Sequence, residues 1–446
     1  MKWFAAAAAL SWTVLGLLWA QVVVLPEPLL PPPFFAELLG RIPATPRPER
    51  FIIMLVKETS LLLFGFALLG LALAALARRA GAKKSALVAT LLCAATVAVS
   101  LVPVAQAMKT ASSEGVPLSL TGYFADLSPV PDRFADRSPE TVPYAHWGGE
   151  VLKVDVWEPS GDHSRGTSRH SGVEVAAAER RPAVIVVHGG GWRSGERSDF
   201  PSWNAWLADT GYVVFDIDYR LSPPPAWQDA PADVACAVGW VKENAARYGV
   251  DPERVALMGR SAGGHLALLA AYTEGPAAPT PGCAVRNVQD TGVAAVAAFY
   301  PPTDLPRLSS MGYLGGMDRF LGGTQAVFPE RYRLSSPVAR VDSGDPPTFL
   351  AHGGDDRIVP PEESELLAEE LQEVGIPYRL VKLPWANHTF DFLWGGWGSQ
   401  ITRSSLEAFL ESHLQSPEEA TKTGPFERQI KGQRHEGSPS ERTTKF

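Results

Sequence analysis

Residues 257–265, Leu-Met-Gly-Arg-Ser-Ala-Gly-Gly-His, constrain the fold of this chain most strongly. Short apolar segments precede and follow them, and the Gly-x-Ser-x-Gly pattern between these predicts a sharp strand-to-helix turn with Ser261 at its apex. Gly259 and Gly263 make room for such a turn because they lack side chains. A serine at a helix N-terminus lies near unpaired N–H groups that favour developing negative charge. The pattern therefore predicts a nucleophilic serine, and an ordinary glycine-rich turn is the alternative.

Three long apolar runs lie before residue 109. Residues 3–25 and 85–108 contain no charged residue, and residues 53–77 contain only Lys57 and Glu58. Each run is long enough to cross a membrane as a helix. We therefore expect three transmembrane helices, with Lys57 and Glu58 near the outer end of the second, because charge at mid-bilayer is costly. A cleaved signal peptide is the alternative for the first run, and buried core helices are the alternative for all three.

Basic residues around these runs predict an orientation. Arg78, Arg79, Lys83 and Lys84 lie between the second and third runs without any acidic residue, whereas the connection at 26–50 balances its arginines with glutamates. Positively charged connections remain in the cytoplasm, so the chain after residue 108 is expected outside it. Cleavage of the first run as a signal would leave two spans and the same placement.

Apolar and amphipathic segments alternate between residues 151 and 414. This alternation predicts a mostly parallel sheet with helices on both faces, in a catalytic domain at 109–415 that follows a membrane region at 1–108. Residues 416–446 lose aliphatic and aromatic content, which predicts a disordered polar tail. Strands are expected at 151–157, 183–187, 212–217, 255–258, 293–299, 348–351 and 378–383, and helices at about 199–210, 230–247, 262–273, 362–374 and 401–414.

Charge and cysteine content exclude some functions. The net charge of −8 argues against a nucleic-acid partner. Cys93, Cys236 and Cys283 show no metal-ligand spacing and are expected to be small buried residues. A bridge between Cys236 and Cys283 remains open if the domain lies in an oxidising compartment.

Two further predicted strands and a glycine-rich loop supply candidate partners for Ser261. The strand at 183–187 runs into His188-Gly-Gly-Gly-Trp192, whose N–H groups could surround an anion. The strand at 348–351 leads to Asp355 and Asp356, and the strand at 378–383 leads to His388. Carboxyl ends of parallel strands meet at one sheet edge, where ligands bind. Serine, aspartate and histidine thus follow strands in the chain order of the α/β-hydrolases.

Taken jointly, these motifs resemble the carboxylesterase branch of the α/β-hydrolases, closest to the bacterial feruloyl-esterase-like group and related to hormone-sensitive-lipase-like esterases. The resemblance covers about 150–414 and leaves the first 108 residues unexplained. Arg260 departs from the lipase-like branch, which has an acid before the serine, and this leaves the acyl preference open. The matching stretches are 188–192, Asp-Tyr-Arg-Leu at 218–221, 259–267, His352-Gly353 with Asp356, and Asn387-His388 with Phe390.

The resemblance implies a role for each matched residue. Ser261 is the expected nucleophile, His388 the general acid/base, and Asp356, rather than the adjacent Asp355, the residue that orients the histidine. The N–H groups of Gly190, Gly191 and Ala262 are the expected oxyanion donors.

The resulting prediction is a membrane-anchored serine carboxylesterase that needs no metal or cofactor and acts on a small-molecule or lipid ester. An amidase or peptidase with the same triad is one alternative, and a non-catalytic hydrolase-like binding domain is another. Residues 302–338 form either a lid or plain packing. Trp385, Trp394 and Trp397 line a pocket, touch lipid or pack in the core.

Overall fold

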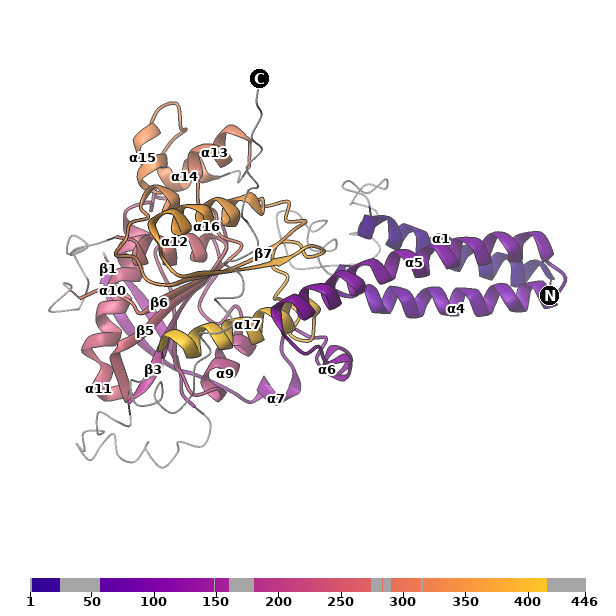
Figure 1. Ribbon diagram of the computed structural model, residues 1–446, viewed down its shortest axis with the longest axis horizontal. Helices are drawn as coiled ribbons and strands as arrows, with labels where there is room; N and C mark the ends of the chain where they lie inside the picture. Colours follow the sequence, from indigo (N-terminus) through magenta and orange to yellow (C-terminus); the bar gives the residue numbers. More distant parts are fainter. Residues whose placement is uncertain are drawn as a thin grey trace, which may run out of the picture.

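The structure of the protein is a computed structural model that describes residues 2–24, 57–147, 149–159, 180–273, 283, 290–313 and 316–414. The connection at 26–50 and the tail predicted at 416–446 lie outside these ranges. The described chain forms a bundle of long helices that projects from one side of an α/β domain (Figure 1).

The bundle contains α1 (Lys2–Val24), α4 (Ser60–Arg79) and α5 (Lys83–Glu114). α4 runs away from the domain and α5 returns to it, with α1 packed beside both (Figure 1). Small side chains at the helix contacts let the backbones approach closely. The buried alanines of this contact are Ala6 and Ala9 of α1, Ala74 and Ala77 of α4, and Ala86 and Ala89 of α5.

Within the described residues, two helices, α4 and α5, are long and apolar enough to cross a membrane. Within α1, the described apolar stretch Trp3–Leu17 is shorter than α4 or α5. The prediction of three transmembrane helices is therefore supported for two and corrected for the first, whose apolar character also fits a signal sequence.

The predicted boundaries of the second and third spans also change. α4 begins at Ser60, so Lys57 and Glu58 precede this helix. α5 continues to Glu114, six residues past the end of the charge-free run at 108. Residues 53–56 lie outside the described ranges.

The domain is built on an eight-stranded sheet with the order β1-β2-β4-β3-β5-β6-β7-β8. β1 and β2 pair antiparallel, β2 pairs antiparallel with β4, and all remaining pairs are parallel. All seven predicted strands are confirmed, and β1 is an eighth strand that the sequence did not predict. The strands are β1 (Glu140–Trp147), β2 (Glu150–Trp157), β3 (Arg181–Val187), β4 (Val213–Ile217), β5 (Val250–Arg260), β6 (Ala295–Phe299), β7 (Thr348–Gly353) and β8 (Tyr378–Leu383).

Helices cover both faces of the sheet, as predicted (Figure 1). Successive strand side chains point to opposite faces: Ile185 packs on one side, whereas Val184 and Val186 pack on the other. The Ile185 side is covered by α10 (Asp229–Glu243), α11 (Ala245–Tyr248), α12 (Ala262–Ala271) and α16 (Glu362–Val374), and the opposite side by α9 (Pro201–Asp209), α17 (Trp397–Leu414) and the end of α5. The helix predicted at 230–247 is two helices that meet at Asn244.

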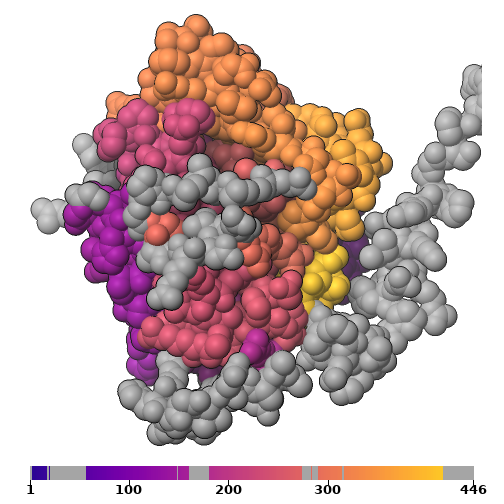
Figure 2. Space-filling model, turned by 90° about the vertical axis from the view of Figure 1, so that its left-hand side faces the viewer, coloured from indigo at the N-terminus to yellow at the C-terminus, as the bar shows by residue number. Residues whose placement is uncertain are grey.

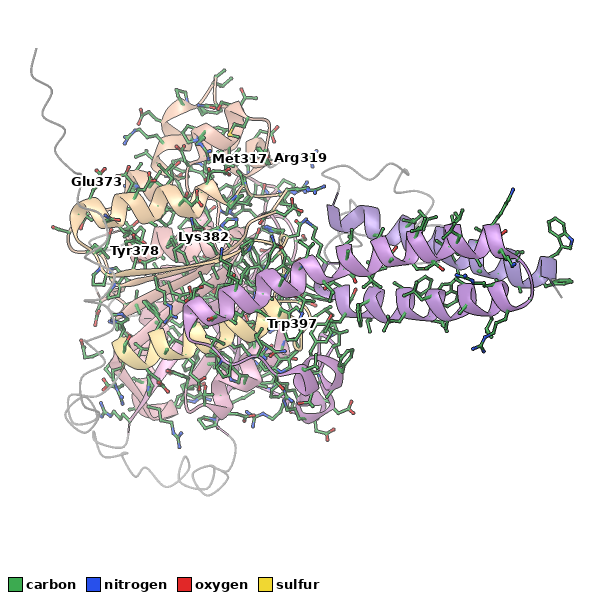
Figure 3. All side chains as sticks on the ribbon, turned by 45° about the vertical axis from the view of Figure 1, so that its right-hand side comes forward. Met317, Arg319, Glu373, Tyr378, Lys382 and Trp397 are labelled. Carbon is green, nitrogen blue, oxygen red and sulfur yellow. A yellow bond between two sulfur atoms is a disulfide. The ribbon has the colours of Figure 1, made fainter. Side chains whose placement is uncertain are left out.

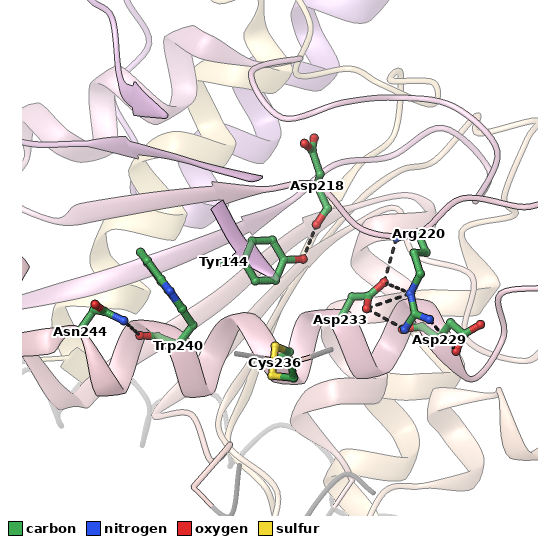
Figure 4. The surroundings of a disulfide bond; sticks show 9 residues. Tyr144, Asp218, Arg220, Asp229, Asp233, Cys236, Trp240 and Asn244 are labelled. Carbon is green, nitrogen blue, oxygen red and sulfur yellow. Dashed lines mark hydrogen bonds and ion pairs between the residues drawn. A yellow bond between two sulfur atoms is a disulfide. The ribbon is translucent and has the colours of Figure 1, made fainter. Parts of the chain in front are cut away.

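The bridge left open by the sequence is formed. Cys236 of α10 is joined to Cys283, with 5.9 Å between the Cα atoms (Figure 4). On the same helix, Asp233 is fully buried and accepts hydrogen bonds from the Arg220 guanidinium. Cys93 of α5 is buried and free, as expected for a small apolar residue.

The segment at 302–338 is an excursion between β6 and β7. It carries α13 (Leu305–Ser310), α14 (Met317–Leu321) and α15 (Pro329–Leu334), which form the projection coloured orange in the view from the side away from the bundle (Figure 2). Most of its apolar side chains are buried in the domain core, although Met311 is half exposed. The packing interpretation is therefore confirmed for these side chains. The core interpretation also holds for Trp385, Trp394 and Trp397, which are buried.

Candidate active site

Ser261 lies at the turn that joins β5 to α12. Its φ of 52° and ψ of −120° belong to a region that non-glycine residues rarely adopt, so the turn is strained. The neighbouring glycines are required by close approach: a Cβ on Gly259 would lie 2.2 Å from the Gly263 carbonyl oxygen, and one on Gly263 would lie 2.2 Å from that of Val187. The sharp turn predicted from the sequence is therefore present.

The structure brings Ser261, His388 and Asp356 into one chain of contacts. His388 Nε2 lies 2.9 Å from Ser261 Oγ, and His388 Nδ1 lies 2.6 Å from Asp356 Oδ2. Asp356 follows β7 and His388 follows β8, two parallel strands whose carboxyl ends lie near that of β5. The sheet edge thus brings together side chains separated by 127 and 32 residues.

Asp356 is held as a buried carboxylate. Its Oδ1 accepts the N–H groups of Ile358 (2.8 Å) and Val359 (3.0 Å). Burial alone would raise the pKa of Asp356, but the facing imidazoles of His388 and His352 hold it well below its usual range. Asp355 does not contact His388; it pairs with Arg357 at 3.1 Å and with Lys57.

The glycine loop after β3 lies against this turn. A Cβ on Gly189 would approach Ser261 Cβ to 3.5 Å. Gly190 and Gly191 have φ values of 107° and 63°, which glycine adopts without strain. Their N–H groups donate to no acceptor in the described part of the chain, and Ala262 is the first residue of α12. Three N–H groups near the serine are therefore candidates for binding an anion.

A buried histidine fixes the position of the glycine loop. His265 Nε2 lies 2.7 Å from the Ser335 carbonyl oxygen, and its Nδ1 accepts the indole N–H of Trp192 at 3.2 Å. Burial lowers the pKa of His265 to about 4, so its ring stays neutral and keeps this acceptor. Trp192 also stacks on Phe320 of α14, with 4.7 Å between the ring centroids. The 302–338 excursion therefore packs against the glycine loop, through Phe320 on Trp192 and through the Ser335 carbonyl on His265.

A second polar network was not predicted from the sequence. Arg260 Nε donates to Asp391 Oδ2 at 2.5 Å, and the Tyr300 hydroxyl donates to Asp391 Oδ1 at 2.6 Å. All three side chains are buried. Because Arg260 precedes Ser261 and Asp391 follows His388 by three residues, the network joins the segments that carry them. The sequence holds one hint of this network: Arg260 and Asp391, which carry opposite charges, lie beside the Ser261 and His388 motifs.

No group of three or more His, Cys, Asp or Glu side chains in the described ranges is arranged to hold a metal ion.

Comparison with known proteins now defines the class. The BD-FAE family model matches residues 174–371. Esterase LipQ of Mycobacterium tuberculosis is 31% identical over 268 residues, which are 59% of this chain and 60% of LipQ. The isoprenylcysteine alpha-carbonyl methylesterase ICME of Arabidopsis thaliana is 30% identical over 48% of this chain and 51% of ICME. A solved thermophilic esterase of Thermogutta terrifontis matches with a TM-score of 0.50 and 26% identity, over 65% of this chain and 97% of that chain.

The sheet order and the likeness to this solved esterase show an α/β-hydrolase fold. The esterase matches support ester hydrolysis by such a domain, as a serine ester hydrolase. The chain spans 60% and 51% of the length of the two curated relatives.

Proposed function

We propose that the domain predicted at 109–415 is a serine carboxylesterase with a triad of Ser261, His388 and Asp356. The observation that carries this proposal is the chain of contacts from Asp356 Oδ2 through His388 to Ser261 Oγ, at 2.6 and 2.9 Å. It gives the serine a base and gives the base an orienting carboxylate.

The proposed reaction has two halves. Ser261 Oγ attacks the ester carbonyl carbon while His388 Nε2 takes the hydroxyl proton, and the carbonyl π electrons move to the oxygen. The N–H groups of Gly190, Gly191 and Ala262 receive this oxyanion, and each such donor contributes about 2.7–4 kcal/mol. The oxyanion then collapses, the C–O bond to the alcohol breaks, and His388 protonates the leaving alkoxide. Water, activated by His388, releases the acid from the acyl-enzyme.

Short-chain carboxylic esters are the proposed first class of substrate. Structures of the Thermogutta terrifontis esterase were solved with propionate and with butyrate bound, and both match this chain with a TM-score of 0.50. We include lipid esters in the class because the domain is joined directly to apolar helices.

The proposed location is the membrane, with the domain outside the cytoplasm. α4 and α5 are apolar enough to cross a membrane, and four basic residues lie between their apolar parts. The Cys236–Cys283 bridge supports this placement, since disulfides persist in oxidising compartments.

Replacement of the nucleophile tests the proposed function. Ser261→Ala is expected to lower kcat toward p-nitrophenyl butyrate by about 10⁶-fold, as triad loss does in serine hydrolases, while the fold stays intact. A fluorophosphonate probe is expected to label the wild-type protein at Ser261 and to leave the variant unlabelled. Labelling that persists in the Ser261→Ala protein would refute the assignment.

A further inference from the structure

Lys57 and Glu58 lie at the junction between α4 and the hydrolase domain, and both are buried. Their exposed fractions are 6% and 2%, which is unusual for these residue types. The backbone here is fixed from the domain side as well, because the Tyr123 hydroxyl donates to the Glu58 carbonyl oxygen at 2.5 Å. The two side chains therefore face protein and need partners inside it.

The Lys57 ammonium pairs with the carboxylate of Asp355. Asp355 is the residue directly before Asp356, in the loop that follows β7. The only side-chain cation besides Lys57 that pairs with Asp355 among the described residues is Arg357, at 3.1 Å. Lys57 thus contacts the loop that presents the proposed catalytic acid.

Glu58 contacts the neighbouring loop. Its Oε1 accepts the indole N–H of Trp385 at 3.1 Å, three residues before His388. Its Oε2 accepts the N–H of Gly398 at 3.4 Å in the first turn of α17. The adjacent Trp397 lies where the bundle meets the domain and stacks on Tyr123 at 4.4 Å (Figure 3). The Glu58 carboxylate therefore contacts both the loop that follows β8 and the first turn of α17.

The domain is shaped to admit this carboxylate. A Cβ on Gly396 would lie 2.7 Å from Glu58 Oε2, and one on Gly398 would lie 3.3 Å from Oε1. Burial raises the pKa of Glu58 to about 7, against hydrogen bonds from Gly398, Trp385 and Trp397 that favour the carboxylate form. Burying an acid costs free energy, and the N–H donors around the Glu58 carboxylate fix its position. This arrangement argues that the contact has a positioning role.

We propose that Lys57 and Glu58 are positioning residues, through which the helix α4 junction holds the Asp356 loop and the His388 loop in register for catalysis. This inference rests on the proposed function. On this proposal the Lys57–Glu58 segment before α4 contributes to catalysis and does more than attach the domain to the helices. Because small displacements of catalytic groups cost rate, loosening either contact lowers kcat and leaves ester binding unchanged.

Point variants of the full-length protein in detergent test this inference. Lys57→Met removes the charge on the Asp355 side, and Glu58→Gln keeps the shape while it replaces one acceptor oxygen by a donor. Each is expected to lower kcat by about tenfold with KM unchanged, and Lys57→Arg is expected to recover most of the loss. The rate is expressed per Ser261 titrated with a fluorophosphonate, so that unfolded protein does not count.

Lys382→Met is the matched control. Lys382 lies on β8, the same strand that leads to His388, and pairs with Glu365 at 2.9 Å, but this pair is exposed (Figure 3). Its removal is expected to leave kcat per titrated serine unchanged. If Lys57→Met and Glu58→Gln also stay within twofold of the wild type, the positioning role is overturned. If the fluorophosphonate does not label Ser261 in the wild-type protein, the proposed function itself is overturned.

Trp385→Phe provides an independent variant that keeps an aromatic ring, although a smaller one, and removes the donor to Glu58. It is expected to lower kcat, and the double variant is expected to lose no more than Glu58→Gln alone, because the Trp385 contact is one of those that Glu58→Gln already disturbs. Additive losses would show that Glu58 and Trp385 act separately and would contradict the inference.

Discussion

At the scale of single residues, a buried ion pair explains the departure of Arg260 from the lipase-like pattern. That pattern places an acid before the nucleophilic serine, whereas here the acid is Asp391, which binds Arg260 at 2.5 Å. The Arg260 guanidinium also lies over the rings of Phe200 and Trp203, at 4.2 and 5.0 Å from their centroids. The carboxylate and the aromatic faces offset part of the cost of burying this cation, and Arg260 Nη2 has no hydrogen-bond partner in the described part of the chain. The positive charge before Ser261 therefore has a structural role: it pairs with Asp391 and so joins the segment that carries Ser261 to the segment that carries His388.

The two adjacent aspartates after β7 should behave differently when each is changed to asparagine. Asp356→Asn is expected to lower kcat by about 10⁴-fold, because the histidine loses the carboxylate that sets its tautomer. Asp355→Asn is expected to lose no more than about tenfold, since the Asp355 carboxylate pairs with Lys57 and Arg357 and supports the triad only through the positioning contact with Lys57. Steady-state ester hydrolysis of both variants, normalised to titrated serine, checks this. An exchange of the two outcomes would show that Asp355 is the orienting acid.

The site was predictable from sequence where a motif follows a strand. Ser261, Asp356 and His388 could be proposed because each comes directly after an apolar segment whose end reaches the same sheet edge. Asp391 and Glu58 could not, because their importance lies in partners that are far away along the chain. Arg260 and Asp391 are 131 residues apart, and Glu58 and Trp385 are 327 apart. Such pairs are created by the fold and leave no local pattern.

At the scale of elements, the parallel strands were predicted well and the antiparallel edge strand β1 was missed. β3 and β4 are mostly apolar and rich in valine and isoleucine, and β6 is apolar throughout, so the sequence shows them as short apolar segments. β1 buries only Tyr144 and Ala145, which are adjacent, and contains Pro143, so its sequence shows no alternation of apolar and polar residues. The end of α5 was missed for a related reason, since residues 109–114 are polar in sequence but pack on the domain. Edges and junctions depend on neighbours that the local sequence does not contain.

The pairing of β2 with β4 places two acids opposite each other, and this predicts a pH-dependent stability. Asp155 lies opposite Asp216, and Asp216 is buried with one carboxyl oxygen bound by Ser198 N–H and Asn204 and the other without a partner in the described chain. Burial raises the pKa of Asp216 to about 7. The folded state therefore retains a proton that the unfolded state loses above pH ~3.9, so the contribution of Asp216 to stability is complete below that pH and is lost as the pH rises to about 7.

Asp216→Asn should remove this loss because an amide imitates the protonated acid. Relative to the wild type, the variant is expected to gain stability between pH 4 and pH 7, by on the order of 4 kcal/mol. Thermal unfolding of the full-length protein in detergent across that range measures the gain. Asp132→Asn, at an exposed aspartate of α7 (Asp132–Ala135), serves as control. Parallel pH profiles for the wild type and Asp216→Asn would contradict the prediction.

At the scale of the whole molecule, the end of α5 packs into the core of the hydrolase domain, while the alanine contact between α1, α4 and α5 forms a separate cluster. Ala107 and Ala111 of α5 are buried in the same cluster as residues of α17, and Glu114 at the end of α5 pairs with Arg379 of β8 at 2.8 Å. The hydrolase domain is therefore joined to the bundle by packing at the end of α5 and by the contacts of Lys57 and Glu58 before α4. If α4 and α5 cross a membrane, these contacts keep the domain next to its surface.

The arrangement of the bundle predicts the side of the membrane on which the domain lies. Arg78 and Arg79 end α4, Lys83 and Lys84 begin α5, and this turn lies at the end of the bundle far from the domain (Figure 1). Because such basic turns stay in the cytoplasm, the opposite end, with the hydrolase domain, is expected outside. The expectation is the same whether α1 spans the membrane or is removed as a signal sequence, since α4 and α5 together return the chain to the outer side. A reporter active only in the cytoplasm should therefore give signal when inserted in the 79–83 turn and none when fused after residue 415. Signal from the fusion at 415 would place the domain inside and would overturn the proposed location, while leaving the assignment of the esterase site untouched.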